Sequence, residues 1–530
     1  MTAVNSTTYD AVIVGGGHNG MVCAFYLAKR GRKVLVLERR DVVGGAAVTE
    51  EFHPGFRNSM AAYTVSLLAP QVINEMELGR HGLTTVLRKA SNFLPTEDGR
   101  YLLTGRGSES DRAEISKFSA KDADAYVRYN QRLDAIVPAL RNILHATPPS
   151  PKGGIMDAIH AAGLALQLNK LDIEGQRDLL DLFARSAGEW LDEWFESEPI
   201  KAVLGFDSIV GNFASPYTPG SAYVLLHHVF GEVNGVAGAW GHAIGGMGAI
   251  TQAMAKACRE AGVDIRTGCE VSEILVENGA AVGVRLEKGE TFRAAKVISN
   301  VHPKILYERL IDKKALPDAF SNRIANFRSG SGTFRMNVAL SELPKFTALP
   351  EMGDHLTAGI IMAPTLAYMD RAYDDARKNG WSKQPIVEML IPSTLDDSLA
   401  PPGQHVASLF CQQFSPTLPD GKSWDDHRDE VADLVIDTVD AHAPGFKASV
   451  LGRIAFTPLD LERRFGLIGG DIFHGKLSLD QMFSARPMLG HGAYRGPLKG
   501  LYMCGAGSHP GGGVTGIPGR NAAREILRDR

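Results

Sequence analysis

The sequence predicts an α/β protein, and three observations lead to this class. A short apolar run at residues 9–14 ends on a cluster of glycines, as buried parallel strands often do. A segment with helical periodicity and a second apolar run, residues 33–37, follow directly. Strand-like runs and helical segments then alternate through the remainder of the chain. With 530 residues the chain is too long for one core, so two or more domains are expected.

The composition excludes several classes of protein. Lys and Arg (56) nearly balance Asp and Glu (60), which gives no electrostatic support for a nucleic-acid partner. The N-terminus resembles neither a secretory signal nor a transit peptide, and no apolar run approaches the ~18 residues of a membrane span. The five cysteines are scattered without a C-x-x-C pair, so no disulfide framework, redox disulfide or metal site is predicted. We therefore expect a cytoplasmic protein with reduced thiols.

The first strand leads into a G-x-G-x-x-G turn formed by Gly15, Gly17 and Gly20. The helix that follows, residues 18–30, ends before Gly31, and the second strand ends in Glu38. Glycines at this spacing let the backbone approach a pyrophosphate at a helix N-terminus, and an acid about 20 residues later binds a ribose hydroxyl. The order of these elements predicts a Rossmann-type dinucleotide site. Glu38 disfavours a 2′-phosphate but does not distinguish NAD from FAD.

Three further segments indicate FAD. The second strand is followed by Arg39 and by Gly44-Gly45, and this resembles flavoproteins of the amine oxidase and phytoene desaturase superfamily. The resemblance implies that Arg39 and the two glycines contact FAD, with the glycines against its phosphates. The relatives usually continue with Arg, whereas this chain has Ala46, so backbone amides would replace one phosphate contact.

The second of these segments is glycine-rich, residues 241–248, and leads into a helix and strands up to residue 300. In the superfamily this block returns the chain to the FAD domain, and the residue matching Val271 contacts the adenine through its backbone.

The third segment is a C-terminal glycine loop between a short strand, residues 501–504, and a helix that extends to about Arg528. Such a helix start aims amides at a flavin carbonyl or ribityl oxygen, and the superfamily uses a similar segment in this way. The resemblance gives five further FAD-contact candidates: Gly505, Gly512, Gly513, Val514 and Gly516.

The resemblance covers nearly the whole chain. Residues 194–199, 215–221 and 471–474 are similar to the family called pyridine nucleotide-disulfide oxidoreductase domain-containing protein 2, a phytoene-desaturase-related group. It implies a glutathione-reductase-like α/β (α+β) fold with a discontinuous FAD-binding domain, residues 1–75, 235–305 and 490–530. A mixed helical and sheet substrate domain, residues 76–234 and 306–489, would interrupt it. Despite the family's name, one Rossmann fingerprint and no cysteine pair predict neither a pyridine-nucleotide domain nor a redox disulfide.

The apolar helix at residues 155–168 has few charges. We interpret it as a buried core helix; the alternative is a helix that lies on a membrane surface.

Two residues are candidates for catalysis. Arg335 stands in a strand, residues 332–340, where amine oxidases place a lysine that bonds a water at the flavin N5. Because Arg is not a base near neutral pH, it would orient water or an anionic group; the alternative is a solvated strand arginine. His509 lies in the flavin loop and is the best candidate for a titrating group. His227, His228 and His474 are weaker candidates.

The predicted function is an FAD-dependent dehydrogenase or desaturase that transfers hydride from an apolar, isoprenoid- or lipid-like substrate to flavin N5. Oxygen, a quinone or another carrier would accept the electrons. Alternatives are an amine oxidase and an FAD-binding scaffold with little turnover. Flavin-free escort proteins share this architecture, but they have no use for the phosphate turn, ribose acid and flavin loop together.

Overall fold

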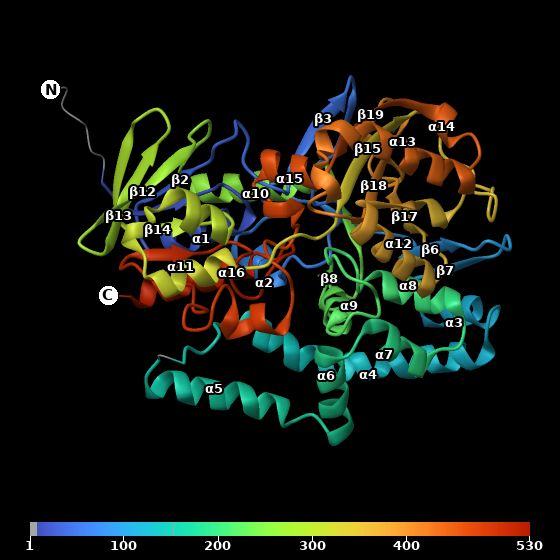
Figure 1. Cartoon of the computed structure of the whole chain (residues 1–530), viewed down its shortest axis with the longest axis horizontal. Coiled ribbons are helices and arrows are strands. Elements are labelled where there is room, and N and C mark those ends of the chain that lie inside the picture. Colours follow the sequence, from blue (N-terminus) through green and yellow to red (C-terminus); the bar gives the residue numbers. More distant parts are fainter. Residues whose placement is uncertain (1–7, 152, 530) are drawn as a thin grey trace.

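The computed structural model describes residues 8–151 and 153–529. Residues 1–7, where the sequence suggests no targeting segment, lie outside the described part. Two large sheets lie side by side, the first at the left and the second at the right of Figure 1, with a layer of helices below them. Within the described residues no helix is long and apolar enough to cross a membrane.

The first sheet has the strand order β11-β2-β1-β14-β13-β12, with β20 beside β14. Strands β11, β2, β1, β14 and β20 are parallel, whereas β12, β13 and β14 form an antiparallel meander. The strands span Tyr9–Val14 (β1), Val34–Leu37 (β2), Asp264–Arg266 (β11), Val271–Glu277 (β12), Ala280–Leu286 (β13), Thr291–Ser299 (β14) and Leu501–Met503 (β20). All of them fall within the three ranges predicted for the FAD-binding domain.

Three helices cover the parallel strands: α1 (His18–Ala28), α10 (Met247–Glu260) and α16 (Ile517–Arg528). Their apolar faces pack with β1 and β2 in one core. Helices α1 and α16 approach so closely that a Cβ at Gly519 would lie 2.1 Å from the Asn19 carbonyl oxygen. The C-terminal helix is therefore fixed against the helix that follows the glycine turn.

The second sheet has the order β19-β15-β18-β17-β16-β6-β7 and is antiparallel except for the β16–β6 pair. Helix α13 (Trp424–His442) covers one face, and α12 (Leu366–Asn379) packs with the helical layer against the other. The strands are Asn92–Pro95 (β6), Tyr101–Thr104 (β7), Phe334–Leu340 (β15), Gly359–Met362 (β16), Trp381–Leu390 (β17), His405–Phe414 (β18) and Val450–Phe456 (β19).

The helical layer contains α3 (Ser108–Ser116), α4 (Ala120–His145), α5 (Ile155–Leu168), α6 (Ile173–Ala184), α7 (Ala187–Trp194), α8 (Glu198–Phe206) and α9 (Ser221–Val229). Short elements connect the layers: the pairs Thr49–His53 (β3) with Phe56–Ser59 (β4), Thr85–Leu87 (β5) with Gly241–Ala243 (β10) and Glu232–Val233 (β8) with Val236–Ala237 (β9), and the helices Pro70–Glu75 (α2), Asp318–Ala325 (α11), Phe446–Ser449 (α14) and Pro458–Phe465 (α15).

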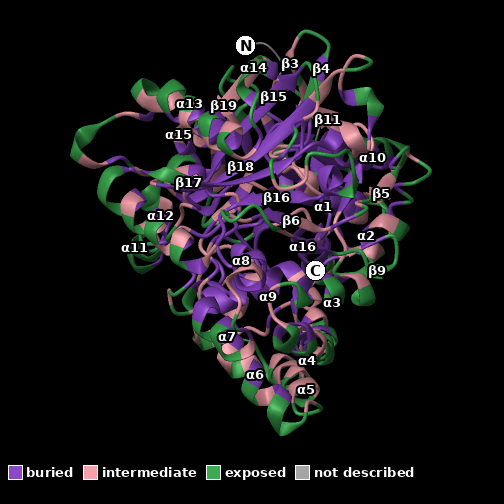
Figure 2. Ribbon diagram, turned by 90° about the vertical axis from the view of Figure 1, so that its right-hand side faces the viewer, coloured by how far each residue is buried: buried purple, intermediate pink, exposed green. Residues whose placement is uncertain are grey.

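The interpretation of residues 155–168 as a buried core helix is wrong. The segment does form a helix, α5, but none of its residues is buried. It lies at the lower edge of the molecule in Figures 1 and 2, away from the two sheets. The four side chains Ile155, Met156, Ile159 and Leu166 are between 59% and 79% exposed. Low charge therefore marks an uncovered helix here, and membrane contact stays a prediction.

Candidate functional site

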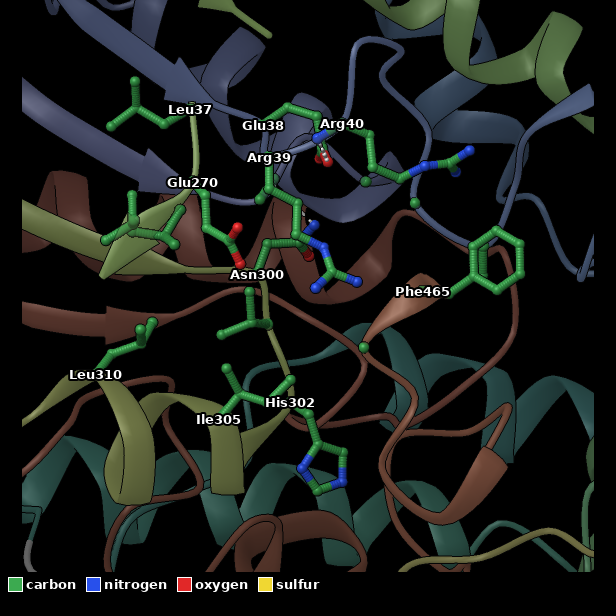
Figure 3. A pocket seen from close by; sticks show the side chains of 18 of the residues that line it. Leu37, Glu38, Arg39, Arg40, Glu270, Asn300, His302, Ile305, Leu310 and Phe465 are labelled. Carbon is green, nitrogen blue, oxygen red and sulfur yellow. Dashed lines mark hydrogen bonds between the residues drawn. The ribbon is translucent and has the colours of Figure 1, made fainter. Parts of the chain in front are cut away.

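A cavity of about 350 Å³ opens at the carboxyl ends of β1, β2 and β14. This position is where open parallel sheets bind their ligands. In Figure 3, Glu38 and Arg39 from the end of β2 lie near Asn300 from the end of β14, and His302 lies below them. We call this the nucleotide cavity.

The glycine turn forms one wall of the nucleotide cavity. Gly17 is the N-cap of α1, and no side chain caps the first amides of this helix. Those amides remain available to an anion, and the helix dipole favours one there. Gly44 crosses the turn, donates its N–H to the Gly16 carbonyl at 2.9 Å and has a φ of +130°. A Cβ at Gly44 would lie 2.5 Å from the Ala47 oxygen, so only glycine fits this crossing.

Glu38 is held in place by the backbone. Its Oε2 accepts the Gly16 N–H at 2.8 Å, and its Oε1 accepts the Arg40 N–H at 3.0 Å. The side chain is 5% exposed and lines the cavity. The neighbouring Arg39 donates to the carbonyl oxygens of Arg463 and Arg464 while lining the same cavity. The acid therefore has a fixed orientation at the end of β2, as a ribose ligand requires.

The strand β14 contributes a residue that the sequence analysis did not single out as a ligand. Asn300 lines the cavity and donates its Nδ2–H to the Gly15 carbonyl at 3.2 Å. A Cβ at Gly17 would lie 2.8 Å from this nitrogen, and one at Gly20 would lie 2.4 Å from the Gly15 oxygen. Asn300 thus packs on the bare glycines of the turn. Its position at a carboxyl strand end was the signal that could have identified it.

A second cavity of about 130 Å³ adjoins the first, and we call it the apolar cavity. Aliphatic and aromatic side chains dominate its wall, with Tyr63 stacked on Phe410 at a centroid distance of 4.9 Å. No Asp, Glu, Lys or Arg is among the described residues that line it. Four residues line both cavities: His18, Ala46, His474 and Ala506. The two cavities therefore meet at these residues.

The two histidines at this junction are neutral. Burial lowers the pKa of His18 to about 4. Burial, together with Arg486 and His18, lowers the pKa of His474 to about 3. The Nε2 of His18 and the Nδ1 of His474 are buried without a hydrogen-bond partner from the protein. Buried polar atoms without partners at a junction of two cavities are typical of a ligand site.

The structure brings together nine of the predicted cofactor contacts. Those that line the nucleotide cavity are Gly15, Gly17, Glu38, Arg39, Gly44, Gly45 and Val271, and those that line the apolar cavity are Gly513 and Val514. Gly20, Gly505, Gly512 and Gly516 line neither. A Cβ at Gly512 would lie 2.3 Å from the Phe473 ring and one at Gly505 would lie 2.7 Å from the Asn300 oxygen, so these glycines permit close packing behind the site.

The two predicted catalytic residues line neither cavity. His509 is 1% exposed, and its Nε2 lies 3.1 Å from the Leu144 carbonyl oxygen at the end of α4. Arg335 is fully buried and donates to Ala61 O, Leu409 O and Ser408 Oγ. The alternative of a solvated strand arginine is therefore wrong. Arg335 instead lies 4.8 Å from the centre of the Tyr63 ring, behind the wall of the apolar cavity.

The nucleotide cavity fits an FAD molecule. Uncapped amides and the Gly17–Gly44 crossing form a cradle for a pyrophosphate, and Glu38 stands at the ribose position. The unpaired histidine nitrogens lie where this cavity meets the apolar one, which suits the polar edge of a flavin. Among the described residues, no group of three or more His, Cys, Asp or Glu side chains could hold a metal ion. The fold and the site define a flavoprotein oxidoreductase.

Comparison with known proteins identifies the family. The chain belongs to the flavin-containing amine oxidoreductase family, whose model matches residues 20–527. It is 43% identical to rat pyridine nucleotide-disulfide oxidoreductase domain-containing protein 2, across 98% of this chain and 94% of the relative. It is 26% identical to a limonene dehydrogenase polypeptide of Castellaniella defragrans, across 98% and 94%. The solved structure of a putrescine oxidase superposes with a TM-score of 0.59 at 13% identity, covering 98% of each chain.

These findings confirm the superfamily, the Rossmann-type fold and FAD as the cofactor. The protein is an FAD-dependent oxidoreductase.

Proposed function

We propose that the protein dehydrogenates an apolar substrate bound in the apolar cavity. The observation that carries this proposal is the absence of Asp, Glu, Lys and Arg from the described wall of that cavity. FAD, when bound, supplies a hydride acceptor at N5. Ala61, Tyr63 and Phe410 would hold the substrate by contact and exclude water, and the junction residues would bring its reacting carbon to the flavin.

The amine alternative has weaker support from the site. A protonated amine inside an apolar cavity requires a carboxylate or a dense aromatic cage to replace its hydration. The nearest buried carboxylate, Glu388, lies behind the wall and accepts the Tyr63 hydroxyl at 2.6 Å. An uncharged hydrocarbon needs no such partner. The name of the limonene dehydrogenase polypeptide, a relative over nearly the full chain, agrees with a terpene-like substrate.

Anaerobic reduction of the bound flavin tests this proposal. The FAD-loaded protein is mixed separately with limonene, a long acyclic polyene and putrescine, and the visible flavin band is followed. Bleaching by limonene or the polyene, and not by putrescine, is expected. Bleaching by putrescine alone would establish the amine alternative. If no compound bleaches the band while FAD stays bound, the scaffold alternative replaces the proposal.

A further inference from the structure

The loop from Asp471 to Gly475 carries a residue with an unusual backbone. His474 has a φ of +54°, in the left-handed region that side chains other than Gly, Asn and Asp rarely adopt. Backbone strain of this kind costs of order 1–3 kcal/mol and persists only where the surroundings impose it, commonly at functional sites. The surroundings of His474 are therefore informative.

Asp471 fixes the loop from within. Its carboxylate is 1% exposed and accepts three backbone N–H groups. Oδ1 accepts the Phe473 N–H at 2.8 Å, and Oδ2 accepts the Gly475 N–H at 3.1 Å and the Gly330 N–H at 2.8 Å. The amides on both sides of His474 are thus bound to one buried carboxylate.

Arg486 fixes the same loop from the other side. Its guanidinium is fully buried and donates to the carbonyl oxygens of Phe473 at 2.7 Å, His474 at 3.4 Å and Gly475 at 3.3 Å. It also donates to Ala506 O at 2.8 Å. His474 and Ala506 both line both cavities. One arginine therefore ties together the two loops that meet at the junction.

The imidazole of His474 is free to accept a proton. No protein group bonds its buried Nδ1. The titratable and charged groups that face it are His18, Arg486 and His302, whose ring centre lies 5.8 Å away. His302 accepts the Lys304 N–H at Nδ1, so its Nε2–H donates to Ser329 Oγ at 2.8 Å, and it is not available as a base.

We propose that His474 is the catalytic residue that accepts the proton released when the substrate is dehydrogenated; this rests on the proposed function. One substrate C–H bond leaves with its electron pair as hydride to the flavin, the oxidant. The neighbouring C–H bond then becomes strongly acidic, its electron pair forms the new C=C bond, and its proton passes to the neutral imidazole. Asp471 and Arg486 are positioning residues, because they act only through the loop.

His474→Gly with added imidazole tests the assignment. Glycine suits a φ of +54° and leaves space for imidazole in place of the side chain. Stopped-flow reduction by whichever compound bleaches the wild type should slow by about 10²–10⁴-fold. Free imidazole should restore the rate in proportion to its unprotonated fraction, which a merely structural role would not produce. His427→Gln, on the surface of α13, is the matched control and should reduce at the wild-type rate.

The resting flavin spectrum gives a readout that is independent of turnover. Because His474 lines the nucleotide cavity, His474→Gly should shift the visible flavin band, and imidazole should reverse the shift; His427→Gln should not change it. Reduction of His474→Gly at the wild-type rate, or loss of activity without imidazole rescue, would overturn the proton-acceptor role. Failure of every compound to reduce the wild type would instead overturn the proposed function, and an unshifted spectrum would place His474 away from the flavin.

Discussion

At the scale of single residues, the glycine turn depends on contacts within the protein as well as on the cofactor. Glu38 accepts two backbone N–H groups, from Gly16 and Arg40, before any ribose is bound. Each of its oxygens has a further lone pair for a ribose hydroxyl. Asn300 similarly bonds Gly15 and covers Gly17. Side-chain changes here therefore alter both the shape of the turn and the affinity for FAD.

Glu38→Ala is expected to weaken FAD binding. It removes charge-assisted hydrogen bonds to the adenosine ribose and leaves the Gly16 amide without its partner, a loss on the order of 1–3 kcal/mol. This corresponds to a roughly 5- to 150-fold higher dissociation constant, measurable by flavin fluorescence on serial dilution. Glu430→Ala on α13 is the control and should bind FAD normally. An unchanged dissociation constant in Glu38→Ala would locate the ribose elsewhere.

Gly17→Ala is expected to bind FAD more weakly than Glu38→Ala. The added methyl group would lie 2.8 Å from Asn300 Nδ2 and would stand where the backbone meets the pyrophosphate. Gly163→Ala on α5, where nothing lies within 4 Å of the new Cβ, is the control. FAD occupancy after gel filtration measures the effect. Full occupancy of Gly17→Ala would contradict the assignment of this turn to the pyrophosphate.

The spacing of glycines and acid predicts the residues of the nucleotide cavity well, because a strand, turn and helix fix their positions locally. The junction is different. His18 lies inside the motif and His474 lies in a distant loop, and only the tertiary fold brings them together. His509, which the sequence favours, is turned toward α4 by the packing of its own loop. Proximity in sequence to the flavin segment therefore does not fix the direction of a side chain.

At the scale of helices and strands, periodicity identifies the element but not what covers it. Helices α4 and α5 follow each other in the chain. Nine residues of α4 are buried, including Leu133, whereas α5 has none. The apolar side chains of α5, including Ile155 and Ile159, face outward. A low charge content is consistent with a core helix or an uncovered one, so the sequence alone could not choose between them.

Replacement of the exposed apolar side chains of α5 is expected to leave the stability unchanged. The variant combines Ile155→Gln, Met156→Gln, Ile159→Gln and Leu166→Gln, since glutamine is a good helix former. Each change should alter the free energy of unfolding by less than about 0.5 kcal/mol. Leu133→Ala on α4, 3% exposed, should instead lose about 2–5 kcal/mol. Urea denaturation compares them; a large loss in the α5 variant would mean that this face is covered.

The C-terminus of α8 gives a prediction about pH. Burial, together with the Glu388 carboxyl, raises the pKa of Asp207 to about 8, and Asp207 is the C-cap of α8, where the helix dipole also disfavours a carboxylate. An unfolded Asp has a pKa of about 3.9. The folded chain therefore holds a proton that the unfolded chain releases, so this contribution to stability is complete below about pH 4 and is lost as the pH rises to 8.

Asp207→Asn should therefore flatten the dependence of stability on pH and should stabilise the protein at pH 8 relative to the wild type. Urea denaturation at pH 5.5 and pH 8 measures both effects. Asp433→Asn on α13, where the carboxylate is largely exposed, serves as the control and should retain the wild-type pH dependence. An Asp207→Asn variant that loses stability between pH 5.5 and 8 as steeply as the wild type would show that Asp207 is ionised in the folded chain.

At the scale of the whole molecule, the two sheets are joined by buried polar contacts beside the site. Arg335 on β15 donates to Ala61 O, and Asn337 on the same strand donates to Ser59 O at 2.9 Å. Ala61 lines the apolar cavity, so the second sheet supports its wall. The order of motifs predicts which segments supply each sheet. It does not predict this contact, because the partners lie more than 270 positions apart.

The reduced flavin is expected to pass its electrons to oxygen, a quinone or another carrier, and not to exchange them with NAD(P). A nicotinamide dinucleotide bound in the usual way needs its own glycine turn at the end of a parallel strand. In the described residues the β1-α1-β2 unit already forms the nucleotide cavity, and the second sheet is antiparallel apart from the β16–β6 pair.

Stopped-flow mixing of the oxidised protein with NADH or NADPH decides the matter. We expect at most slow, unsaturable bleaching, because neither coenzyme has a second phosphate turn to hold its nicotinamide at the flavin. Dithionite serves as the positive control, since it reduces flavin without a binding site. Saturable reduction by either coenzyme at a turnover-like rate, about 1–10³ per second, would show that the chain binds nicotinamide outside a Rossmann unit. The apolar cavity would then be the place to look for the nicotinamide, since it shares His474 and Ala506 with the nucleotide cavity.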